Sequence, residues 1–445
     1  MTQTIYALAS GRGRAGVAII RVSGPQALHS LELLSGLNEP ALRYAHFVKL
    51  RHHVSRETID HALVLFFENP HSFTGEDVAE YHLHGSQAII EEVLSCLKAQ
   101  PNHRMAEPGE FTRRGFENGK MDLTEAEAIN DLINAQTQLQ KAQALRQLEG
   151  GLKELYSGWA ARLTKTLAYL EADLEFPDED DADGVSREVI PIIDQLMSEL
   201  ALHLSDNRRG EILRDGFQIA IIGAPNAGKS SLLNALAKRD VAIVSNVAGT
   251  TRDVLEVNLD LAGYPVILSD TAGIRFEELD NENDHDRIET EGIKRAIKRA
   301  EEADLKILLY DGTKEEPDPY TLSLIDEDSV SVANKSDAGI KLDCGTPLLE
   351  ISAKTGDGIE KLLDVITQKI EERMGGSETI SLTRVRHRAS LESCYQALKR
   401  SKDAALPELM TEDVRLAIRH LGQITGRVDV EDLLDVVFRD FCIGK

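Results

Sequence analysis

Short apolar runs separated by turn residues characterise the first 119 residues of the chain. Runs rich in apolar residues occupy residues 17–22, 62–67 and 78–83, and each has the length of a β-strand. Apolar positions then recur at helical spacing over residues 88–97. Because these runs are short, the pattern predicts a small α+β domain over residues 1–119.

Helical periodicity takes over after residue 120. Thr124 is followed three residues later by Glu127, which predicts a capping box at the start of a helix. Helix-forming residues continue, with few interruptions, to an acidic stretch over residues 175–184 that predicts a solvated connection. Amphipathic stripes return over residues 390–401, 411–421 and 430–438. These stretches predict one helical domain made from two chain segments, residues 120–211 and 376–445.

Between these helical segments, short apolar runs alternate with helix patterns. The expected strands cover residues 218–223, 266–269, 306–310 and 330–333, and the expected helices cover residues 231–237 and 288–300. Alternation of this kind predicts parallel strands joined by crossover helices. The expected fold class is therefore a multidomain α/β and α chain, in which an α/β domain over residues 212–375 is inserted into the helical domain.

Composition narrows the classes of protein and partner. The chain has 445 residues, 42% of them apolar and 28% charged, which suits a folded protein of two or three domains. Its formal charge of −25 opposes generic attraction to nucleic acid, so RNA contact requires a local basic patch. The apolar runs are far shorter than the roughly 20 residues of a membrane helix, and no secretory signal pattern is evident. We expect no membrane span and a cytoplasmic location.

Cysteine spacing argues against both a structural zinc site and a disulfide framework. Cys96, Cys344, Cys394 and Cys442 are widely separated and form no Cys-x-x-Cys pair. The first three are expected to be plain core residues, whereas Cys442 lies within the last four residues of the sequence.

A phosphate-binding loop is the strongest chemical signal. Residues 223–230, Gly-Ala-Pro-Asn-Ala-Gly-Lys-Ser, match the pattern GxxxxGK[ST] between an expected strand and an expected helix. Backbone N–H groups and the positive end of the helix can surround phosphate oxygens, while Lys229 adds a cation. The Ser230 hydroxyl can coordinate Mg²⁺. This loop predicts a nucleoside triphosphate site.

Two further motifs serve the metal and the terminal phosphate. Asp270-Thr-Ala-Gly273 follows an expected strand, so its carboxylate can reach the magnesium shell and Gly273 allows backbone approach to phosphate. The run Gly249-Thr-Thr251-Arg-Asp offers a hydroxyl on a loop that can become ordered by the terminal phosphate. Thr251 is the expected metal ligand.

The base is read by two later motifs. Asn334-Lys335-Ser-Asp337 follows another expected strand, and the Asp337 carboxylate can accept from the ring N–H and the exocyclic amine of guanine. Adenine offers no such pair of donors, so GTP is favoured over ATP. Ser352-Ala353-Lys354 is expected to contact guanine as well.

These five elements resemble the Ras-like GTPase superfamily, and the Thr-Thr-Arg-Asp run resembles its TrmE–Era–EngA branch. Three flanking segments, residues 16–24, 107–127 and 441–445, are similar to the MnmE (TrmE) family of tRNA-modification GTPases, and the similarity spans the whole chain. It implies an N-terminal domain that binds folate and dimerises, a two-part helical domain and an inserted Ras-like GTPase domain.

The resemblance also implies partners and chemistry. A homodimer would work with the FAD-containing protein MnmG in a hetero-oligomer, with tRNA as substrate. Together they would install an aminomethyl or carboxymethylaminomethyl group at C5 of the wobble uridine. The carbon would come from a tetrahydrofolate derivative, in 5-formyl or methylene form.

The family's nucleotide contacts transfer residue by residue onto this chain. Lys229 is implied in catalysis, and Ser230 and Thr251 are implied as Mg²⁺ ligands. K⁺ takes the place of an arginine finger in this family, and its implied ligands are Asn226, Ser245, Val247 and Thr250. The full set implied for GTP is Asn226, Ala227, Gly228, Lys229, Ser230, Ser231, Ser245, Asn246, Val247, Ala248, Gly249, Thr250, Thr251, Asp270, Thr271, Ala272, Gly273, Asn334, Lys335, Asp337, Ser352, Ala353 and Lys354.

The family's catalytic glutamate, which orients the attacking water, falls on Glu289. It precedes Gly292-Ile293 by the family's spacing, but the acidic surroundings leave Glu291 and Glu282 as competitors. A helix-surface charge is the ordinary alternative for Glu289, and a loop-stabilising role is the alternative for Asn226.

The implied folate contacts are Arg21, Glu80, Lys120 and Lys445, and Cys442 matches a cysteine needed for modification. Without the resemblance, Arg21 and Glu80 would be ordinary strand-face charges, and Cys442 could be a buried structural thiol. A zinc site at His82 and His84 is disfavoured, because no further ligands are apparent. The alternative function is a regulatory or ribosome-assembly GTPase switch without one-carbon chemistry.

Overall fold

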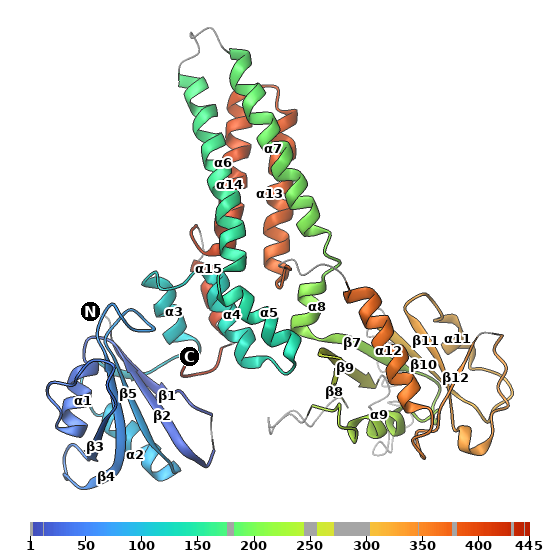
Figure 1. Cartoon of the computed structure of the whole chain (residues 1–445), viewed down its shortest axis with the longest axis horizontal. Helices are drawn as coiled ribbons and strands as arrows, with labels where there is room; N and C mark the ends of the chain where they lie inside the picture. Colours follow the sequence, from blue (N-terminus) through green and yellow to red (C-terminus); the bar gives the residue numbers. More distant parts are fainter. Residues whose placement is uncertain are drawn as a thin grey trace, which may run out of the picture. The chain divides into compact units, whose positions relative to one another are not determined.

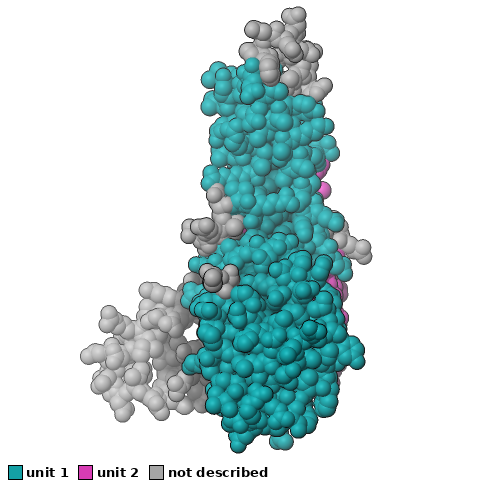
Figure 2. Space-filling model, turned by 90° about the vertical axis from the view of Figure 1, so that its left-hand side faces the viewer, with its two compact units in different colours: residues 1–130, 147–197, 393–445 teal, residues 131–146, 198–392 magenta. Residues whose placement is uncertain are grey.

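A computed structural model describes residues 3–11, 13–175, 182–243, 256–270, 303–345, 347–375, 381–428, 431–439 and 441–445. The chain forms two compact units, which are described separately (Figures 1 and 2). Unit 1 comprises residues 1–130, 147–197 and 393–445, and unit 2 comprises residues 131–146 and 198–392.

Unit 1 contains a six-stranded sheet with the order β3-β4-β5-β2-β1-β6. Its strands are β1 (Thr4–Leu8), β2 (Ala15–Ser23), β3 (His46–Arg51), β4 (Thr58–Phe67), β5 (Val78–Gly85) and β6 (His103–Met105). Neighbouring strands are antiparallel except for β1 and β6. The expected strands and the α+β class of this region are confirmed.

Helices α1 (Ala27–Ser35) and α2 (Gln87–Lys98) pack on the same face of this sheet. Leu31 of α1 and Cys96 of α2 share a core cluster with inward-facing strand residues such as Ile20 and Tyr81. We call this the inner face. The strand residues of opposite parity, among them Arg21 and Glu80, lie on the outer face of the sheet.

Unit 1 also contains all or part of four long helices (Figure 1). They are α6 (Gly151–Glu175), α7 (Ala182–Leu204), α13 (Val385–Asp403) and α14 (Pro407–Thr425), so the two predicted helical segments of the chain do come together. Within unit 1, α6 packs along α14, and Arg415 of α14 pairs with Glu171 of α6 at 2.8 Å. The short helix α15 (Glu431–Arg439) follows α14, and α7 begins two residues before the expected acidic connection ends.

The predicted capping box is wrong by two residues. Helix α4 (Leu123–Asn134) begins before Thr124, and Asp122 is its cap. The Asp122 carboxylate accepts from the Glu125 N–H at 3.0 Å, and the Glu125 carboxylate accepts from the Asp122 N–H at 2.7 Å. Asp caps a helix as well as Thr does, and both Thr124 and Glu127 are buried inside the helix.

Unit 2 contains a second six-stranded sheet with the order β12-β11-β10-β7-β9-β8. Its strands are β7 (Phe217–Ile222), β8 (Glu256–Leu261), β9 (Tyr264–Asp270), β10 (Leu305–Asp311), β11 (Ser329–Asn334) and β12 (Leu349–Glu350). The predicted parallel strands are confirmed, and β8 adds an antiparallel edge. Helices α9 (Lys229–Ala237) and α12 (Ile359–Met374) pack against this sheet in one core cluster. The expected helix over residues 288–300 lies outside the described residues.

The inserted position of the α/β domain is confirmed by the two places where the chain crosses into it. Helix α8 (Arg209–Asp215) lies on the incoming crossing, and α13 begins on the outgoing one. Arg388 on the outgoing side binds Asp206 at 2.6 Å and Glu211 at 2.9 Å on the incoming side. Gly210 lies so near Leu382 that an added Cβ would be 2.2 Å from the Leu382 carbonyl oxygen.

Among the described residues, no helix combines the length and apolar character that crossing a membrane requires.

Candidate functional site

The phosphate loop connects the end of β7 to the start of α9, as predicted. Gly228 caps α9 with φ 101°, and Asn226 also has a positive φ, 65°. The loop's close packing requires glycine at Gly223, because a Cβ there would lie 2.2 Å from the Leu309 carbonyl oxygen. Lys229 is buried, and its ammonium donates to the carbonyl oxygens of Gly223 at 2.8 Å and Ala224 at 3.1 Å. These two hydrogen bonds hold the positive charge of Lys229 against the phosphate loop.

Asn334 joins the phosphate loop to the guanine motifs. Its side chain is 2% exposed. The amide nitrogen donates to the Ala227 carbonyl at 2.8 Å, and the amide oxygen accepts from the Ala353 N–H at 3.0 Å. Asn334 was predicted as a nucleotide contact. The structure gives it a bridging position between the loop that follows β7 and the loop that follows β12.

Asp337 and the Ser352 loop lie together, as the predicted guanine site requires. The Ser352 hydroxyl donates to the Asp337 carboxylate at 2.7 Å, and the Lys354 ammonium is 3.9 Å from the same carboxylate. One carboxylate oxygen is thereby fixed by Ser352. A carboxylate held in this way can accept from two neighbouring donors of a planar base.

Asp311 is a site residue that the sequence analysis missed. It ends β10, and its carboxylate accepts from the Lys335 ammonium at 2.7 Å and from the Thr313 hydroxyl at 2.7 Å. Burial acts to raise the pKa of Asp311, but these hydrogen bonds outweigh it and hold that pKa below its usual range. Lys335 is thus positioned by an ion pair. The only sequence signal was an Asp at the end of an apolar run.

Several predicted nucleotide contacts lie outside the described residues. The backbone of Asp270 ends β9 beside Ile221, so its position at the carboxyl edge of the sheet is as expected. The predicted site residues that lie outside the described residues are Ser245, Asn246, Val247, Ala248, Gly249, Thr250, Thr251, Thr271, Ala272, Gly273, Glu282, Glu289 and Glu291.

The first two predicted folate residues pair with each other across β2 and β5. Arg21 and Glu80 are direct cross-strand partners, and the Arg21 Nε donates to the Glu80 carboxylate at 2.9 Å. The Arg21 guanidinium also lies over the rings of Phe73, at 5.4 Å, and Phe111, at 5.7 Å. These two aromatic residues were not predicted, although Phe111 belongs to a segment that carried the family resemblance.

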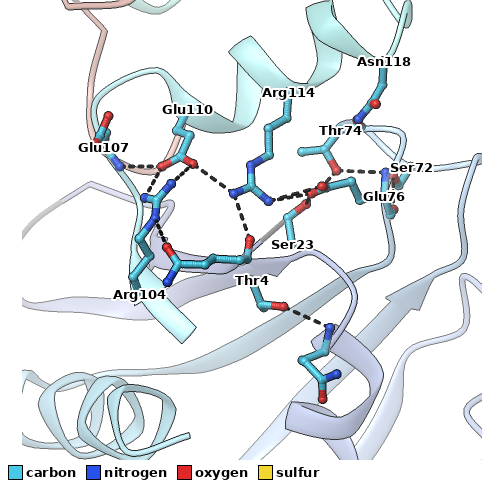
Figure 3. A network of polar contacts seen from close by, with 12 residues as sticks. Thr4, Ser23, Ser72, Thr74, Glu76, Arg104, Glu107, Glu110, Arg114 and Asn118 are labelled. Carbon is cyan, nitrogen blue, oxygen red and sulfur yellow. Dashed lines mark hydrogen bonds and ion pairs between the residues drawn. The ribbon is translucent and has the colours of Figure 1, made fainter. Parts of the chain in front are cut away.

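A network of polar contacts involves residues next to both aromatic residues in sequence (Figure 3). Helix α3 (Glu110–Glu117) begins with Glu110. The Glu110 carboxylate accepts hydrogen bonds from the Arg104 guanidinium at 2.7 Å and from the Arg114 guanidinium at 3.0 Å. Arg114 also donates at 2.9 Å to Glu76, which accepts from the Ser23 hydroxyl at 2.8 Å. Helix α3 and the loop that contains Phe73 are thereby tied to the sheet.

This network also responds to pH. Burial acts to raise the pKa of Glu110, but the bonds from Arg104 and the Glu107 N–H outweigh it and lower that pKa below its usual range. A carboxylate with a depressed folded pKa stabilises the fold above its unfolded pKa. Its contribution is lost as the pH falls through the depressed value.

The C-terminal residues are docked on the N-terminal part of unit 1. The Phe111 N–H donates to the Lys445 carbonyl at 3.2 Å, and the Gly109 N–H donates to the Cys442 carbonyl at 3.3 Å. Pro108 and Ile443 form an antiparallel bridge between these bonds. Gly444 has φ 102° and sits against β1, where an added Cβ would lie 2.2 Å from the Leu8 carbonyl oxygen.

Two predicted residues are brought near this region, and one alternative is excluded. The Lys120 ammonium donates at 2.7 Å to the Pro70 carbonyl, in the loop that also contains Phe73. Cys442 is exposed, so the alternative of a buried structural thiol is wrong. Within the described residues, His82 and His84 belong to no group of three metal-ligating side chains.

Fold and site together define a P-loop GTPase with a Ras-like α/β domain. Residues 4–120 match the family model described as the GTP-binding protein TrmE N-terminus, and residues 123–442 match the MnmE helical domain. The chain is 50% identical to the tRNA modification GTPase MnmE of Parvibaculum lavamentivorans and 48% identical to that of Paramagnetospirillum magneticum, each comparison covering 100% of both chains. The chain belongs to the MnmE (TrmE) family.

Solved structures add a weaker likeness. The G domain of the FeoB iron transporter of T. maritima is 26% identical, and the match covers 35% of this chain and 97% of that one. Its TM-score is 0.25, which is too low to bear on the fold or function of this chain.

Replacing Asp337 with Asn should exchange one acceptor for a donor in the guanine site. We expect GTP affinity to fall by about 10²-fold, with a gain for xanthosine triphosphate, whose base has an oxygen in place of the amine. Nucleotide binding can be measured by competition with a fluorescent GDP. The exposed Asp343→Asn is the control. Unchanged preference for guanine in Asp337→Asn would remove its assigned role.

Replacing Gly444 with Ala should release the docked C-terminal residues. The clash with Leu8 and the positive φ together cost about 1–3 kcal/mol, so amide exchange at Gly109 and Phe111 should speed up by about tenfold or more. Hydrogen-exchange mass spectrometry measures this, and GTP hydrolysis should not change. Gly36→Ala is the control, because Gly36 has a similar positive φ and no atom within 4 Å of an added Cβ. Equal protection in both variants would contradict the docking.

Proposed function

We propose that this GTPase acts in tRNA modification as one of two catalytic partners. With the FAD-containing MnmG it installs an aminomethyl or carboxymethylaminomethyl group at C5 of the wobble uridine of tRNA, using carbon from a tetrahydrofolate derivative. The observation that carries the proposal is the 50% identity, over 100% of both chains, to a relative named tRNA modification GTPase. A cytoplasmic location is part of the proposal, because tRNA is the substrate.

GTP hydrolysis in this proposal depends on charge held at the carboxyl edge of the unit 2 sheet. Lys229 and the N–H groups at the start of α9 bind the phosphates, and Asp337 binds guanine. Ser230 is exposed on the first turn of α9, where its hydroxyl suits Mg²⁺, with Thr251 as the second ligand. The metal neutralises charge that develops on the phosphates.

We further propose that K⁺ supplies the positive charge that other GTPases take from an arginine finger. Asn226 is exposed in the phosphate loop, and its amide oxygen is a suitable ligand for a hard cation. The other proposed ligands are Ser245, Val247 and Thr250. Glu289 is proposed to orient the attacking water.

The region around Arg21 suits a folate. A pterin is flat and carries donors, whereas the other end of a folate carries carboxylates. Phe73 and Phe111 offer aromatic faces, Glu80 offers an acceptor, and Arg21 offers a cation. His82 Nε2 is buried without a hydrogen-bond partner and lies 3.5 Å from the Glu80 carboxylate, so a polar group of a ligand can satisfy it.

Lys445, Lys120 and Cys442 complete this proposed site. The Lys445 carbonyl accepts from the Phe111 N–H, which brings the end of the sequence to the aromatic pair. Lys445 and Lys120 would bind the carboxylates of the folate. Cys442 is exposed on the same docked segment, where its thiol is accessible to a substrate.

The outer face of the unit 1 sheet supports the proposed homodimer. Phe47 on β3 is 71% exposed and pairs in register with Leu63 on β4, which is 43% exposed. Leu63 in turn pairs with His82, and His82 with Ile19. Phe47 and Leu63 are thus an exposed apolar pair on this sheet face, and exposed apolar surface is typical of an association surface. A second copy of the chain is the proposed occupant.

Nucleoside analysis of tRNA tests the proposal. Cells that lack this protein should lose the group at the wobble uridine, and the wild-type protein should restore it. Lys229→Ala should fail to restore it, because the phosphates lose their principal side-chain cation. An exposed lysine variant, Lys238→Ala, is the matched control. Unaltered nucleosides, together with failure of the purified protein to bind a reduced folate, would favour the alternative of a regulatory or ribosome-assembly switch.

Replacing K⁺ with Na⁺ tests the proposed cation. Loss of a preorganised charge at the transition state typically costs about 10²-fold in rate, so GTP hydrolysis should be slower in Na⁺ by that order. Asn226→Ala should abolish the difference between the two salts, whereas the control Asn234→Ala, exposed on α9, should keep it. Phosphate release in both salts is the measurement. Equal rates in K⁺ and Na⁺ for the wild type would exclude the role of K⁺.

A further inference from the structure

Three metal-ligating side chains converge at one edge of the unit 1 sheet, apart from the outer-face site around Arg21. His52 and His53 occupy the turn between β3 and β4, and Cys96 lies on α2. Each of the three offers one ligand atom, and these atoms all lie within 4.8 Å of one another. Cys96 belongs to the inner-face core, whereas Arg21 and Glu80 lie on the outer face.

One histidine of this cluster has a ring nitrogen that the local contacts leave unpaired. His53 Nδ1 is buried and has no hydrogen-bond partner. Burial raises the pKa of the Cys96 thiol, and the backbone of His53 lies near enough to the sulfur to act against that rise. The His52 and His53 rings are stacked, with centroids 4.8 Å apart. A buried ring nitrogen beside a thiol is costly unless something binds it.

We propose that His52, His53 and Cys96 form a binding site for a borderline-soft transition-metal ion, specifically Zn²⁺. Two imidazoles and one thiolate are ligands that select zinc over Mg²⁺ or Ca²⁺. Cys96 releases its thiol proton to solvent as the sulfur–metal bond forms. Three protein ligands leave the fourth tetrahedral position to water or to an added ligand.

The three proposed ligands differ in the hydrogen bonds that each must give up to bind the ion. His52 Nδ1 accepts from the N–H groups of Val54 and Ser55, each at 3.2 Å, so the His52 ring has to release these two long bonds or shift its proton when it binds the ion. His53 and Cys96 need no such exchange. The pair therefore forms the core of the site, and His52 completes it from the partly exposed turn.

The surroundings favour a cation and allow closure around it. Glu92, one turn before Cys96 on α2, places negative charge near the sulfur. A tetrahedral zinc site needs ligand atoms somewhat closer together than 4.8 Å, and the turn that carries both histidines has exposed residues on either side, so it can move inward.

Titration of the purified full-length chain with Co²⁺ tests the proposal. Co²⁺ replaces Zn²⁺ with the same geometry and gives visible bands for a tetrahedral site and a near-ultraviolet band for bonding to thiolate. Both should appear at one equivalent and vanish when Zn²⁺ is added. His53→Gln should weaken binding by about 10- to 100-fold, by analogy with other lost metal contacts, and His52→Gln should weaken it less.

Matched thiol variants decide which sulfur binds. Cys96→Ser should lose the thiolate band, whereas Cys394→Ser, another buried cysteine, and Cys442→Ser, the exposed one, should keep it. Far-ultraviolet circular dichroism shows whether Cys96→Ser is folded, and His53→Gln in the turn gives a second test if it is not. No thiolate band in the wild type, or a band that survives Cys96→Ser, overturns the proposal.

Discussion

One buried amide holds the nucleotide site together. Asn334 donates to the phosphate loop and accepts from the loop that follows β12, so it connects these two loops of the predicted GTP site. The connection is possible because parallel strands bring their carboxyl ends to the same edge of a sheet. Each motif would be an isolated loop without that convergence, and the sheet order places β7 centrally between β10 and β9.

A comparable constraint organises unit 1, but there it is ionic. Glu110 and Arg114 are both nearly buried, and the two charges compensate each other within a network that reaches Arg104 and Glu76 (Figure 3). Removing one partner would leave an unpaired buried charge, which is far more costly than the pair itself is stabilising. Such a network fixes geometry, and here it fixes α3 beside Arg21 and the C-terminal residues.

The sequence predicted most of the unit 2 sheet, because its strands are continuous apolar runs followed by recognisable motifs. Prediction failed where the pattern for an element was weak, or where two residues offered the same signal. Strand β8, Glu-Val-Asn-Leu-Asp-Leu, was missed because it alternates polar and apolar residues and has no continuous apolar run, although Gly263 marks the tight turn to β9. The capping box was misplaced because Asp122 and Thr124 are equally good caps by composition.

Contacts between segments that are far apart in sequence could not be predicted from the sequence. Arg21 and Glu80 were each assigned to a site by resemblance, but only the register of β2 and β5 reveals that they pair. The docking of Cys442 beside Gly109 depends on the path of the whole chain. Cys96 is likewise 43 positions beyond His53 in sequence, so no spacing rule could connect it with the two histidines of the β3–β4 turn.

The adjacency of the two segments that flank the α/β domain, both within unit 2, has a consequence for how such a protein can arise. Gly210 and Leu382 are in van der Waals contact or closer, so the host helices need to be interrupted at only one point. An insert whose own ends meet adds little entropy cost to the host, whatever its length, because its fold closes the loop. A nucleotide-binding module could therefore have been acquired whole, without redesign of the helices that carry it.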